Sequence, residues 1–158
     1  MTKIKTRKEK VTKLLEIARA QLGKPYKYGA YAAKDINENP DSFDCSSFVQ
    51  FCFKSIGFNN FPRSSIEQAT FPGIEISSVE EMGPGDLVFF EGTQGHYRHG
   101  LFGGRKIYIG HVAICIKKSQ IIHAVDRDHV SGVVIQELEE LPNYPNWPNN
   151  IVMIKRYF

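Results

Sequence analysis

Apolar side chains near the start of the chain repeat at helical spacing. They fall three or four positions apart from Val11 to Leu22, and Gly23 supplies a stop signal. This pattern predicts an amphipathic helix over residues 8–22. The residues before it are mostly polar and basic, so we expect 1–9 to form a flexible N-terminal segment.

A second apolar stripe, in the stretch FDCSSFVQFCFKSIGF, has an unusual start. The stripe runs from Cys45 to Ile56, Asp44 has the residue type of an N-cap, and a glycine ends the run. The predicted helix therefore carries a thiol in its first turn. Further on, the sequence SSIE at 64–67 fits a capping box and predicts a short helix through about Ala69.

The second half of the chain changes to β-branched and aromatic runs. Five runs separated by glycine-bearing or polar turns predict strands: DLVFF, HVAICI, QIIHAV, GVVIQEL and IVMIKRYF. Helices in front and strands behind favour an α+β domain with an antiparallel sheet over a doubly wound one. Residues 24–43 and 92–110 read as loops, and loops this long in a compact domain suggest a functional role.

Length and composition narrow the class of protein. The chain has 158 residues, 42% hydrophobic and 23% charged, which predicts one globular domain over 1–158. The net charge of +3 is mild and Lys clusters mainly near the N-terminus, so we expect no nucleic-acid partner. No apolar run reaches the roughly 18 residues that span a bilayer. The start MTKIKTRKEKVTK has no signal-peptide core, so no export signal is visible.

Cysteine and histidine positions point to thiol chemistry. Cys45, Cys52 and Cys115 include no Cys-x-x-Cys pair, so at least one thiol is expected to be free and no zinc pattern stands out. A helix N-terminus favours a thiolate, which marks Cys45 as a candidate nucleophile, whereas Cys52 fits the core. His111 opens one predicted strand and His123 lies in the next. Antiparallel pairing would bring both imidazoles to one sheet face, where one can act as the base and the other can orient it.

Six ordered stretches carry a resemblance to a known family: PYKYG, FDCSSFVQFCFKSIGF, PRSS, GPGDLVFF, GHVAICI and IIHAV. They resemble the successive motifs of NlpC/p60-type cysteine peptidases, papain-like hydrolases of bacterial cell-wall peptides, over about residues 10–158. The resemblance implies a papain-like α+β fold with the cysteine helix packed on an antiparallel sheet. It also implies hydrolysis of peptidoglycan stem peptides, commonly between D-glutamate and the following diamino acid, without a cofactor or metal.

The resemblance assigns the catalytic roles. Cys45 matches the nucleophile, His111 the general base, and His123 the polar residue that orients the base. We expect Cys45 and His111 to form a thiolate–imidazolium pair, with backbone N–H groups at the helix start stabilising the oxyanion. Relatives usually act at the cell envelope or outside the cell. A cytoplasmic location, where the protein would process imported wall fragments, is the alternative.

Five further residues match motifs beside the nucleophile. Tyr26 matches a tyrosine that contributes to the oxyanion or substrate pocket. Asp44 and Ser46 flank the nucleophile, where the family's aspartate receives the free amine of a stem peptide. Arg63 and Ser64 match a motif that lines the cleft.

Some positions depart from the family pattern. Ser47 and Ala30 stand where many relatives have glycine, and the loops at 32–42 and 92–110 are long. Such loops affect the choice of substrate more than the type of reaction. The three remaining histidines lie in loops and are expected to be solvent-exposed: His96, His99 and His129.

Three other functions stay open at the level of sequence. The same nucleophile can serve an amidase or acyltransferase acting on lipid or another amide, because one fold serves many substrates. A second alternative is a catalytically silent binding module. A third is a small metal site made by four residues: Cys45, His111, Cys115 and His123.

Overall fold

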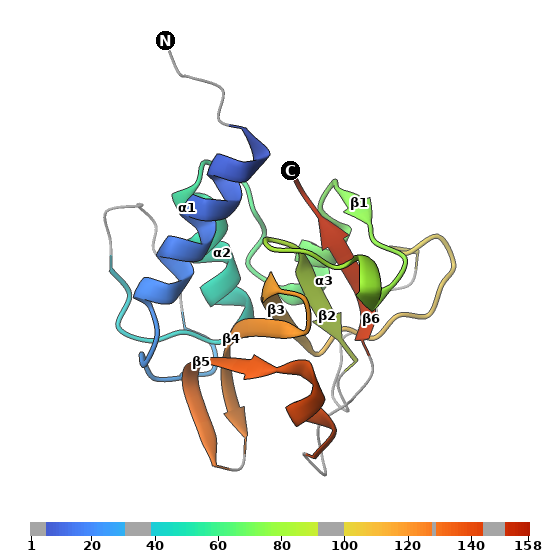
Figure 1. Ribbon diagram of the computed structural model, residues 1–158. Helices are drawn as coiled ribbons and strands as arrows, with labels where there is room; N and C mark the ends of the chain where they lie inside the picture. Colours follow the sequence, from blue (N-terminus) through green and yellow to red (C-terminus); the bar gives the residue numbers. More distant parts are fainter. Residues whose placement is uncertain (1–5, 31–38, 92–99, 128, 144–150) are drawn as a thin grey trace.

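The computed structural model describes residues 6–30, 39–91, 100–127, 129–143 and 151–158 (Figure 1). Along the chain, the elements are α1 (Arg7–Ala20), α2 (Cys45–Ser55), α3 (Ser65–Thr70), β1 (Ile74–Glu75), the 3-10 segment η1 (Val79–Glu81), β2 (Leu87–Phe90), β3 (His111–Lys117), β4 (Gln120–Arg127), β5 (Val130–Glu137), the 3-10 segment η2 (Leu138–Asn143) and β6 (Ile151–Arg156). Helices precede strands, as predicted, and the α+β class is confirmed.

Side-chain caps fix where the helices begin. Asp44 caps α2 by accepting a hydrogen bond from the Ser47 N–H (2.8 Å), and the Ser47 hydroxyl accepts one from the Asp44 N–H (2.9 Å). Ser64 caps α3 by accepting from the Glu67 N–H (3.3 Å). Both predicted N-caps are therefore confirmed. The expectation of a flexible segment over 1–9 was wrong for its last residues, because Thr6 caps α1 and the helix begins at Arg7.

The strands form one antiparallel sheet in the order β1-β6-β2-β3-β4-β5. All five predicted strands are present. The sequence pattern missed β1, because it has only two residues and both are exposed. The last strand, β6, lies between β1 and β2. Helix α2 packs on β3 and β4, which is the arrangement that the family resemblance implied for the cysteine helix.

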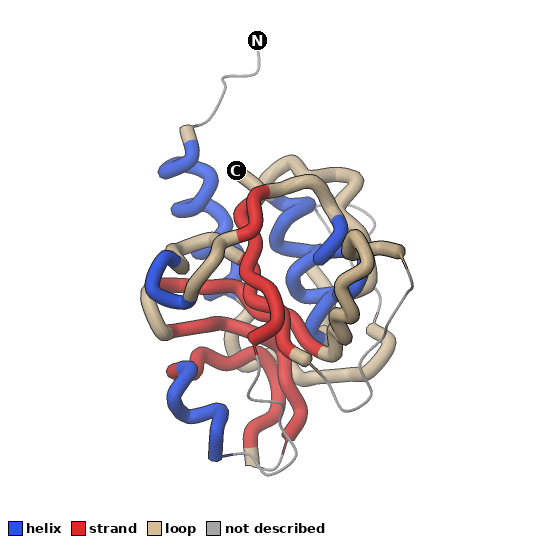
Figure 2. The backbone as a smooth tube through the Cα atoms, turned by 90° about the vertical axis from the view of Figure 1, so that its right-hand side faces the viewer, coloured by secondary structure: helices blue, strands red, loops and turns tan. Residues whose placement is uncertain are grey.

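Both faces of the sheet are covered. On one face, α1 and α2 bury an apolar cluster that includes Leu14, Phe48 and Val112. On the other face, a second cluster includes Cys115 and joins the sheet to residues around the two 3-10 segments. Figure 2 shows the strands running between helical segments on both sides. Burial on both faces explains why the β3 sequence is a nearly continuous apolar run.

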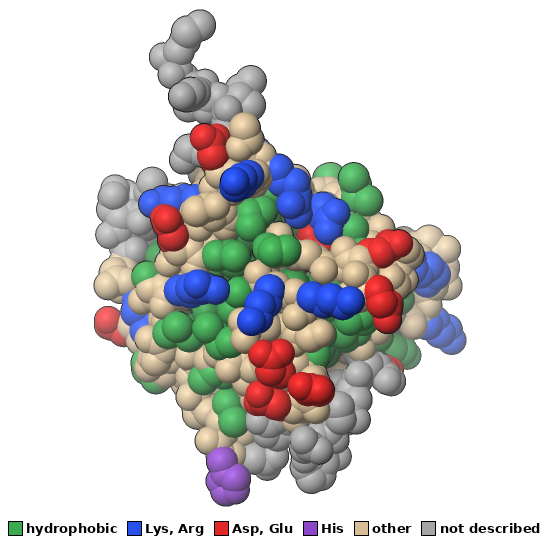
Figure 3. Space-filling model, in the orientation of Figure 1, with side chains coloured by type: hydrophobic (Ala, Val, Ile, Leu, Met, Phe, Trp, Pro, Cys, Tyr) green, Lys and Arg blue, Asp and Glu red, His purple; other side chains and the backbone are tan. Residues whose placement is uncertain are grey.

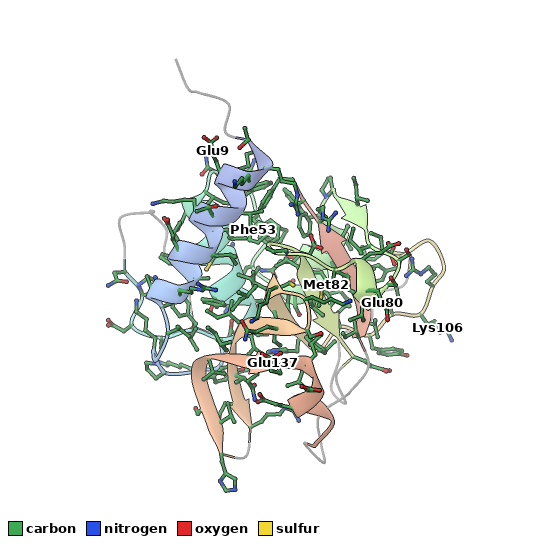
Figure 4. All side chains as sticks on the ribbon, in the orientation of Figure 1. Glu9, Phe53, Glu80, Met82, Lys106 and Glu137 are labelled. Carbon is green, nitrogen blue, oxygen red and sulfur yellow. The ribbon has the colours of Figure 1, made fainter. Side chains whose placement is uncertain are left out.

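Aromatic rings tie the C-terminal half of α2 to the end of the chain. Phe53 stacks on Phe61 with ring centroids 4.4 Å apart and meets Tyr157 edge-on at 5.6 Å. Figure 4 labels Phe53 in the interior beside the helices. Offset and edge-to-face pairs of this kind add to the stabilisation from burial. The nucleophile candidate is therefore carried by a helix that is firmly anchored at its far end.

A buried ion pair joins the ends of the fold. Arg156 donates from Nε and Nη2 to the two carboxylate oxygens of Asp86, both at 2.8 Å, and the Gly83 N–H donates to the same carboxylate. Arg7 of α1 lies 3.7 Å from Asp86. Because the Asp86 side chain is fully buried, these donors replace its lost hydration. This cluster links β2, β6 and the start of α1.

The predicted loops are only partly covered by the described residues. Residues 31–38 and 92–99 lie outside them. Among the described residues, no helix is long and apolar enough to cross a membrane. On the face seen in Figure 3, basic and acidic side chains both occur.

Candidate active site

The Cys45 thiol lies where α2 meets β3. Cys45 is the first residue of α2, is partly buried, and packs against the helix-side core. The backbone N–H groups of Val112 and Ser46 donate hydrogen bonds to its sulfur. Val112 directly follows His111, so the thiol lies at the same end of β3 as this histidine. Residues 66 positions apart in the sequence therefore meet at one site.

Burial outweighs the helix N-terminus in setting the protonation of the thiol. Burial, followed by the negative charge of Asp44, raises the pKa of Cys45 to about 11. The two N–H donors and Arg63 act in the opposite direction without reversing the shift. A helix dipole contributes only about 0.3–1 kcal/mol at exposed sites, which is smaller than a desolvation penalty. The direction of this shift opposes the resting thiolate that the helix start alone would favour.

The two histidines meet, as the alternation of the strands predicted. His111 Nε2 lies 2.7 Å from His123 Nδ1, and both rings are buried. In the β3–β4 pairing, Ile114 lies opposite Ile122. His111 is three residues before Ile114 and His123 one residue after Ile122, so both side chains fall on the same face. The expected contact between the imidazoles is confirmed.

Both histidines are neutral near pH 7. Burial lowers the pKa of His123 to about 4, against a smaller opposing effect of its bond to Gln136. Burial, then His123, then Arg127 hold the pKa of His111 well below its usual value. The directions of these shifts favour a neutral thiol and a neutral imidazole over the thiolate–imidazolium pair expected from sequence.

Gln136 extends the histidine pair and was missed in the sequence. Its Oε1 lies 2.7 Å from His123 Nε2, and the side chain is buried. On β5, Val134 pairs with His123, and Gln136 lies two residues further on, so it shares the face of His123. A glutamine at an inward-facing strand position was the available signal. It became meaningful only once the register of β4 and β5 was known.

A charged cluster fixes the first turn of α2. Arg63 donates from Nη2 to Asp44 Oδ2 (2.7 Å) and from Nη1 to the Ser46 hydroxyl (2.7 Å). Arg63 also donates to the Ala30 carbonyl oxygen. Asp44 Oδ2 accepts a further bond from the Gly29 N–H (3.1 Å). Three of the residues singled out from sequence, Asp44, Ser46 and Arg63, are therefore brought together beside Cys45.

The same contacts limit what Asp44 can offer to a ligand. One carboxylate oxygen is engaged by the helix cap and the other by Arg63 and Gly29. An incoming amine would have to share these oxygens, so the role of Asp44 as an amine receptor stays a prediction. Ser64 caps α3 through Glu67, which accounts for this residue structurally. The serine at 47, unusual for the family, completes the cap of α2.

Tyr26 is held beside the nucleophile by the backbone. It forms a bridge with Phe43, and the Lys27 N–H donates to the Phe43 carbonyl oxygen (2.9 Å). Burial, followed by the charges of Cys45 and Asp44, raises the pKa of Tyr26 above its usual value. The phenol therefore stays protonated and can donate a hydrogen bond close to the thiol.

The alternative metal site does not form. Among the residues that the structure describes, no three His, Cys, Asp or Glu side chains are grouped so as to hold a metal ion. The Cys115 thiol donates to the Lys117 carbonyl oxygen (3.2 Å). His129 is exposed, as predicted, whereas the predictions for His96 and His99 fall outside the described residues.

Comparisons with known proteins match this chain to one family. The sequence profile of the NlpC/P60 family matches residues 23–152. Probable endopeptidase p60 of Listeria grayi is 34% identical over 109 residues, which cover 69% of this chain and 17% of that protein. Murein DD-endopeptidase MepH of Escherichia coli is 33% identical over 92 residues, covering 56% of this chain and 31% of that protein. The chain thus spans well under half the length of these curated relatives.

A solved structure shows the same fold. RipD of Mycobacterium tuberculosis, described as a non-catalytic NlpC/p60 domain protein adapted to a peptidoglycan-binding function, has a TM-score of 0.63 and 17% sequence identity. The match covers 94% of this chain and 98% of that one. At this level of identity, the likeness concerns the fold alone.

Proposed function

The chain belongs to the NlpC/P60 family, and from this premise we propose that it is a cysteine endopeptidase that hydrolyses an amide bond in peptidoglycan stem peptides. Cys45 is the nucleophile, His111 is the general base, and His123 orients His111. The bond cleaved is the one between D-glutamate and the following diamino acid. The observation that carries the proposal is the position of the Cys45 thiol beside the start of β3, together with the His111–His123 contact.

The reaction begins from neutral groups. The thiol proton passes to His111 as the sulfur attacks the amide carbonyl, so the charge pair appears only on the way to the transition state. The resulting imidazolium donates its Nε2–H to His123 Nδ1. His111 then gives the proton to the leaving amine as the C–N bond breaks. Water, with His111 again as the base, hydrolyses the thioester and restores the thiol.

Two donors are suited to the oxyanion. The backbone N–H of Cys45 points from the helix start, where N–H groups lack partners within the helix. The protonated Tyr26 phenol is the second donor, and its electrostatic interaction with Cys45 supports this role. A well-placed oxyanion donor contributes about 3 to 4 kcal/mol to the lowering of the barrier.

The charged cluster has a positioning role in this mechanism. Arg63 ties Asp44 and Ser46 together on either side of Cys45 in the sequence. Gln68 adds a hydrogen bond from its Nε2 to the Ser46 carbonyl oxygen (2.9 Å). These contacts restrict the first turn of α2, so the direction of the Cys45 side chain is fixed before substrate binds.

The test is cleavage of defined substrates followed by mass spectrometry. Purified stem peptides and cross-linked muropeptides are incubated with the wild-type protein, with Cys45→Ser and with Cys52→Ser. We expect fragments from the D-glutamyl bond with the wild type and Cys52→Ser, and none with Cys45→Ser. Fragments from the D,D cross-link would overturn the bond assignment, given the name of the Escherichia coli relative.

Two further outcomes would reject the proposal itself. Folded wild-type protein that binds these peptides without cleaving them would indicate a silent module, as RipD is described to be. Cleavage of an acyl-lipid amide in a parallel assay, with stem peptides untouched, would support the amidase or acyltransferase alternative.

A further inference from the structure

A chain of three buried side chains crosses β3, β4 and β5. His111 Nε2 meets His123 Nδ1 at 2.7 Å, and His123 Nε2 meets Gln136 Oε1 at 2.7 Å. Each contact needs one hydrogen between its two heavy atoms. A neutral imidazole has only one N–H, so the position of one hydrogen decides the positions of the others.

The direction of the chain follows from the end at Gln136. An amide oxygen only accepts, so the hydrogen of His123 is on Nε2. His123 Nδ1 then carries a lone pair and accepts from the Nε2–H of His111. The lone pair of His111 is consequently on Nδ1, the nitrogen that does not face His123. Turning the amide of Gln136 end for end would reverse each step and place a hydrogen on His111 Nδ1.

We propose that Gln136 is a positioning residue that fixes the tautomers of His123 and, through it, of His111, so that His111 presents an unprotonated Nδ1. The use of that nitrogen as the base for Cys45 rests on the proposed function. The fixing of the tautomers does not, because it depends only on contacts within the sheet.

The strand register holds Gln136 in this role. The β4–β5 ladder pairs eight residues of each strand without a shift, from Gln120 opposite Glu137 to Arg127 opposite Val130. Gln136 is therefore fixed relative to His123 by the backbone pairing of β5 with β4.

A neutral acceptor suits this position better than a carboxylate. A negative charge beside His123 would favour its protonated form and counteract the effect of burial. Protonated His123 carries a hydrogen on both nitrogens, so it would no longer accept from His111. An uncharged glutamine keeps the acceptor and leaves both imidazoles neutral, in line with the lowered pKa of each ring.

The direct test is nitrogen-15 NMR of the resting protein, since the shifts of histidine ring nitrogens distinguish protonated from unprotonated atoms. Single His→Gln substitutions assign the signals. We expect His123 and His111 each to carry hydrogen on Nε2, at a pH about two units above the ordinary histidine value of roughly 6.5. A hydrogen on Nδ1 of His123 in the wild-type protein would overturn the proposal. This readout needs neither substrate nor turnover.

Variants at Gln136 extend the test. Gln136→Leu removes the acceptor and is expected to shift His123 away from the single Nε2–H tautomer, lowering kcat at least about tenfold with KM within about twofold, since general-base catalysis contributes about 10²–10⁴-fold. Gln136→Glu restores an acceptor of the same shape and is expected to retain the wild-type tautomers and most of the activity at the same high pH.

Gln120→Met is the matched control. It removes a glutamine side-chain bond on the same strand pair, from Gln120 Nε2 to Glu137 Oε1 (2.8 Å), away from the histidines. It should leave tautomers and kcat unchanged. Wild-type tautomers and kcat in Gln136→Leu would refute the positioning role. Fixed tautomers in a protein that cleaves no stem peptide would reject the proposed function while leaving this inference intact.

Discussion

Helix α2 carries two cysteines, seven positions apart, whose surroundings differ completely. Cys52 is fully buried in the apolar helix-side core, and burial alone raises its pKa. Cys45 also has a raised pKa, but it lies beside two backbone N–H donors, Tyr26 and the charged cluster of Asp44 and Arg63. A perturbed thiol pKa therefore does not distinguish the candidate nucleophile from the structural thiol, whereas polar neighbours do.

The largest effect is expected when the proposed base, His111, is removed from the start of β3, beside the Cys45 end of α2. His111→Ala should lower kcat/KM for stem-peptide cleavage by about 10³-fold, within the range of general-base contributions. Thermal unfolding should show that the fold persists. His129→Ala, which removes an exposed histidine in the β4–β5 turn, is the control and should be fully active. Comparable activity of the two variants would remove His111 from the mechanism.

Acid should lower the free energy of unfolding through the two buried histidines, His111 and His123. The pKa of His123 is about 4 when folded and 6.5 in its unperturbed state. As pH falls between these values, the unfolded chain takes up a proton that the folded chain refuses, so the free energy of unfolding decreases. The loss is about 3 kcal/mol for this group, at 1.36 kcal/mol per pKa unit. His111 contributes in the same direction.

Urea unfolding at several pH values measures this loss. Stability should be fully present above the unperturbed value of 6.5 and should fall steadily toward 4. His123→Gln removes the titrating group and should flatten the profile, whereas His129→Ala should not. A wild-type profile that stays level over this range would show that the pair is not buried in neutral form.

A smaller effect is expected when the cluster around Cys45 is broken. Arg63→Met leaves the buried Asp44 carboxylate without its cation, although the arginine side chain is one-third exposed. We expect a loss of about 1–2 kcal/mol in the free energy of unfolding, from the lost charge-assisted hydrogen bonds. We also expect kcat/KM to fall by about tenfold, because precise positioning of reacting groups is costly to lose.

Arg156→Met is the matched control for the cluster. It breaks the equivalent pair with Asp86, which lies away from Cys45 and joins β2 to β6. This variant should lose about 3–5 kcal/mol in the free energy of unfolding, because the fully buried carboxylate loses both hydrogen bonds from Arg156 and keeps only the Gly83 N–H and the more distant Arg7. Its kcat/KM, measured where it is still folded, should match the wild type. Equal loss of activity in both arginine variants would show that Arg63 acts only through general stability.

The smallest effect on catalysis is expected at Cys52, in the apolar part of α2. Cys52→Ser buries a hydroxyl in an apolar cluster and should lower the free energy of unfolding by about 1–3 kcal/mol. Its kcat/KM should stay within about twofold of the wild type, because this thiol is fully buried in the apolar helix-side core. Denaturant unfolding and the cleavage assay together check this. A folded but inactive Cys52→Ser protein would reverse the assignment of the two thiols.

Local patterns were enough to predict the elements that carry the site. The N-caps at Asp44 and Ser64 follow from residue types alone, and the contact between His111 and His123 follows from strand alternation and chain order. These features depend on neighbours in sequence or on the simplest pairing of adjacent strands. For that reason, no tertiary information was needed to place them.

Other features depend on contacts that only the folded chain supplies. The role of Gln136 requires the register of β4 against β5. The pairing of Arg63 with Asp44 joins residues nineteen positions apart. The raised pKa of Cys45 results from burial under neighbouring elements, which overrides the local effect of the helix start. Sequence thus pointed to the candidate groups, whereas their surroundings depend on packing.

The central claim is that Cys45 forms a covalent intermediate with a stem peptide. The most direct measurement is intact-mass analysis of the protein mixed with the stem peptide and quenched in acid, with the adduct mapped by digestion. We predict an acyl adduct on the peptide containing Cys45, and neither adduct nor product with folded Cys45→Ala. Product release by Cys45→Ala at the wild-type rate would contradict the account.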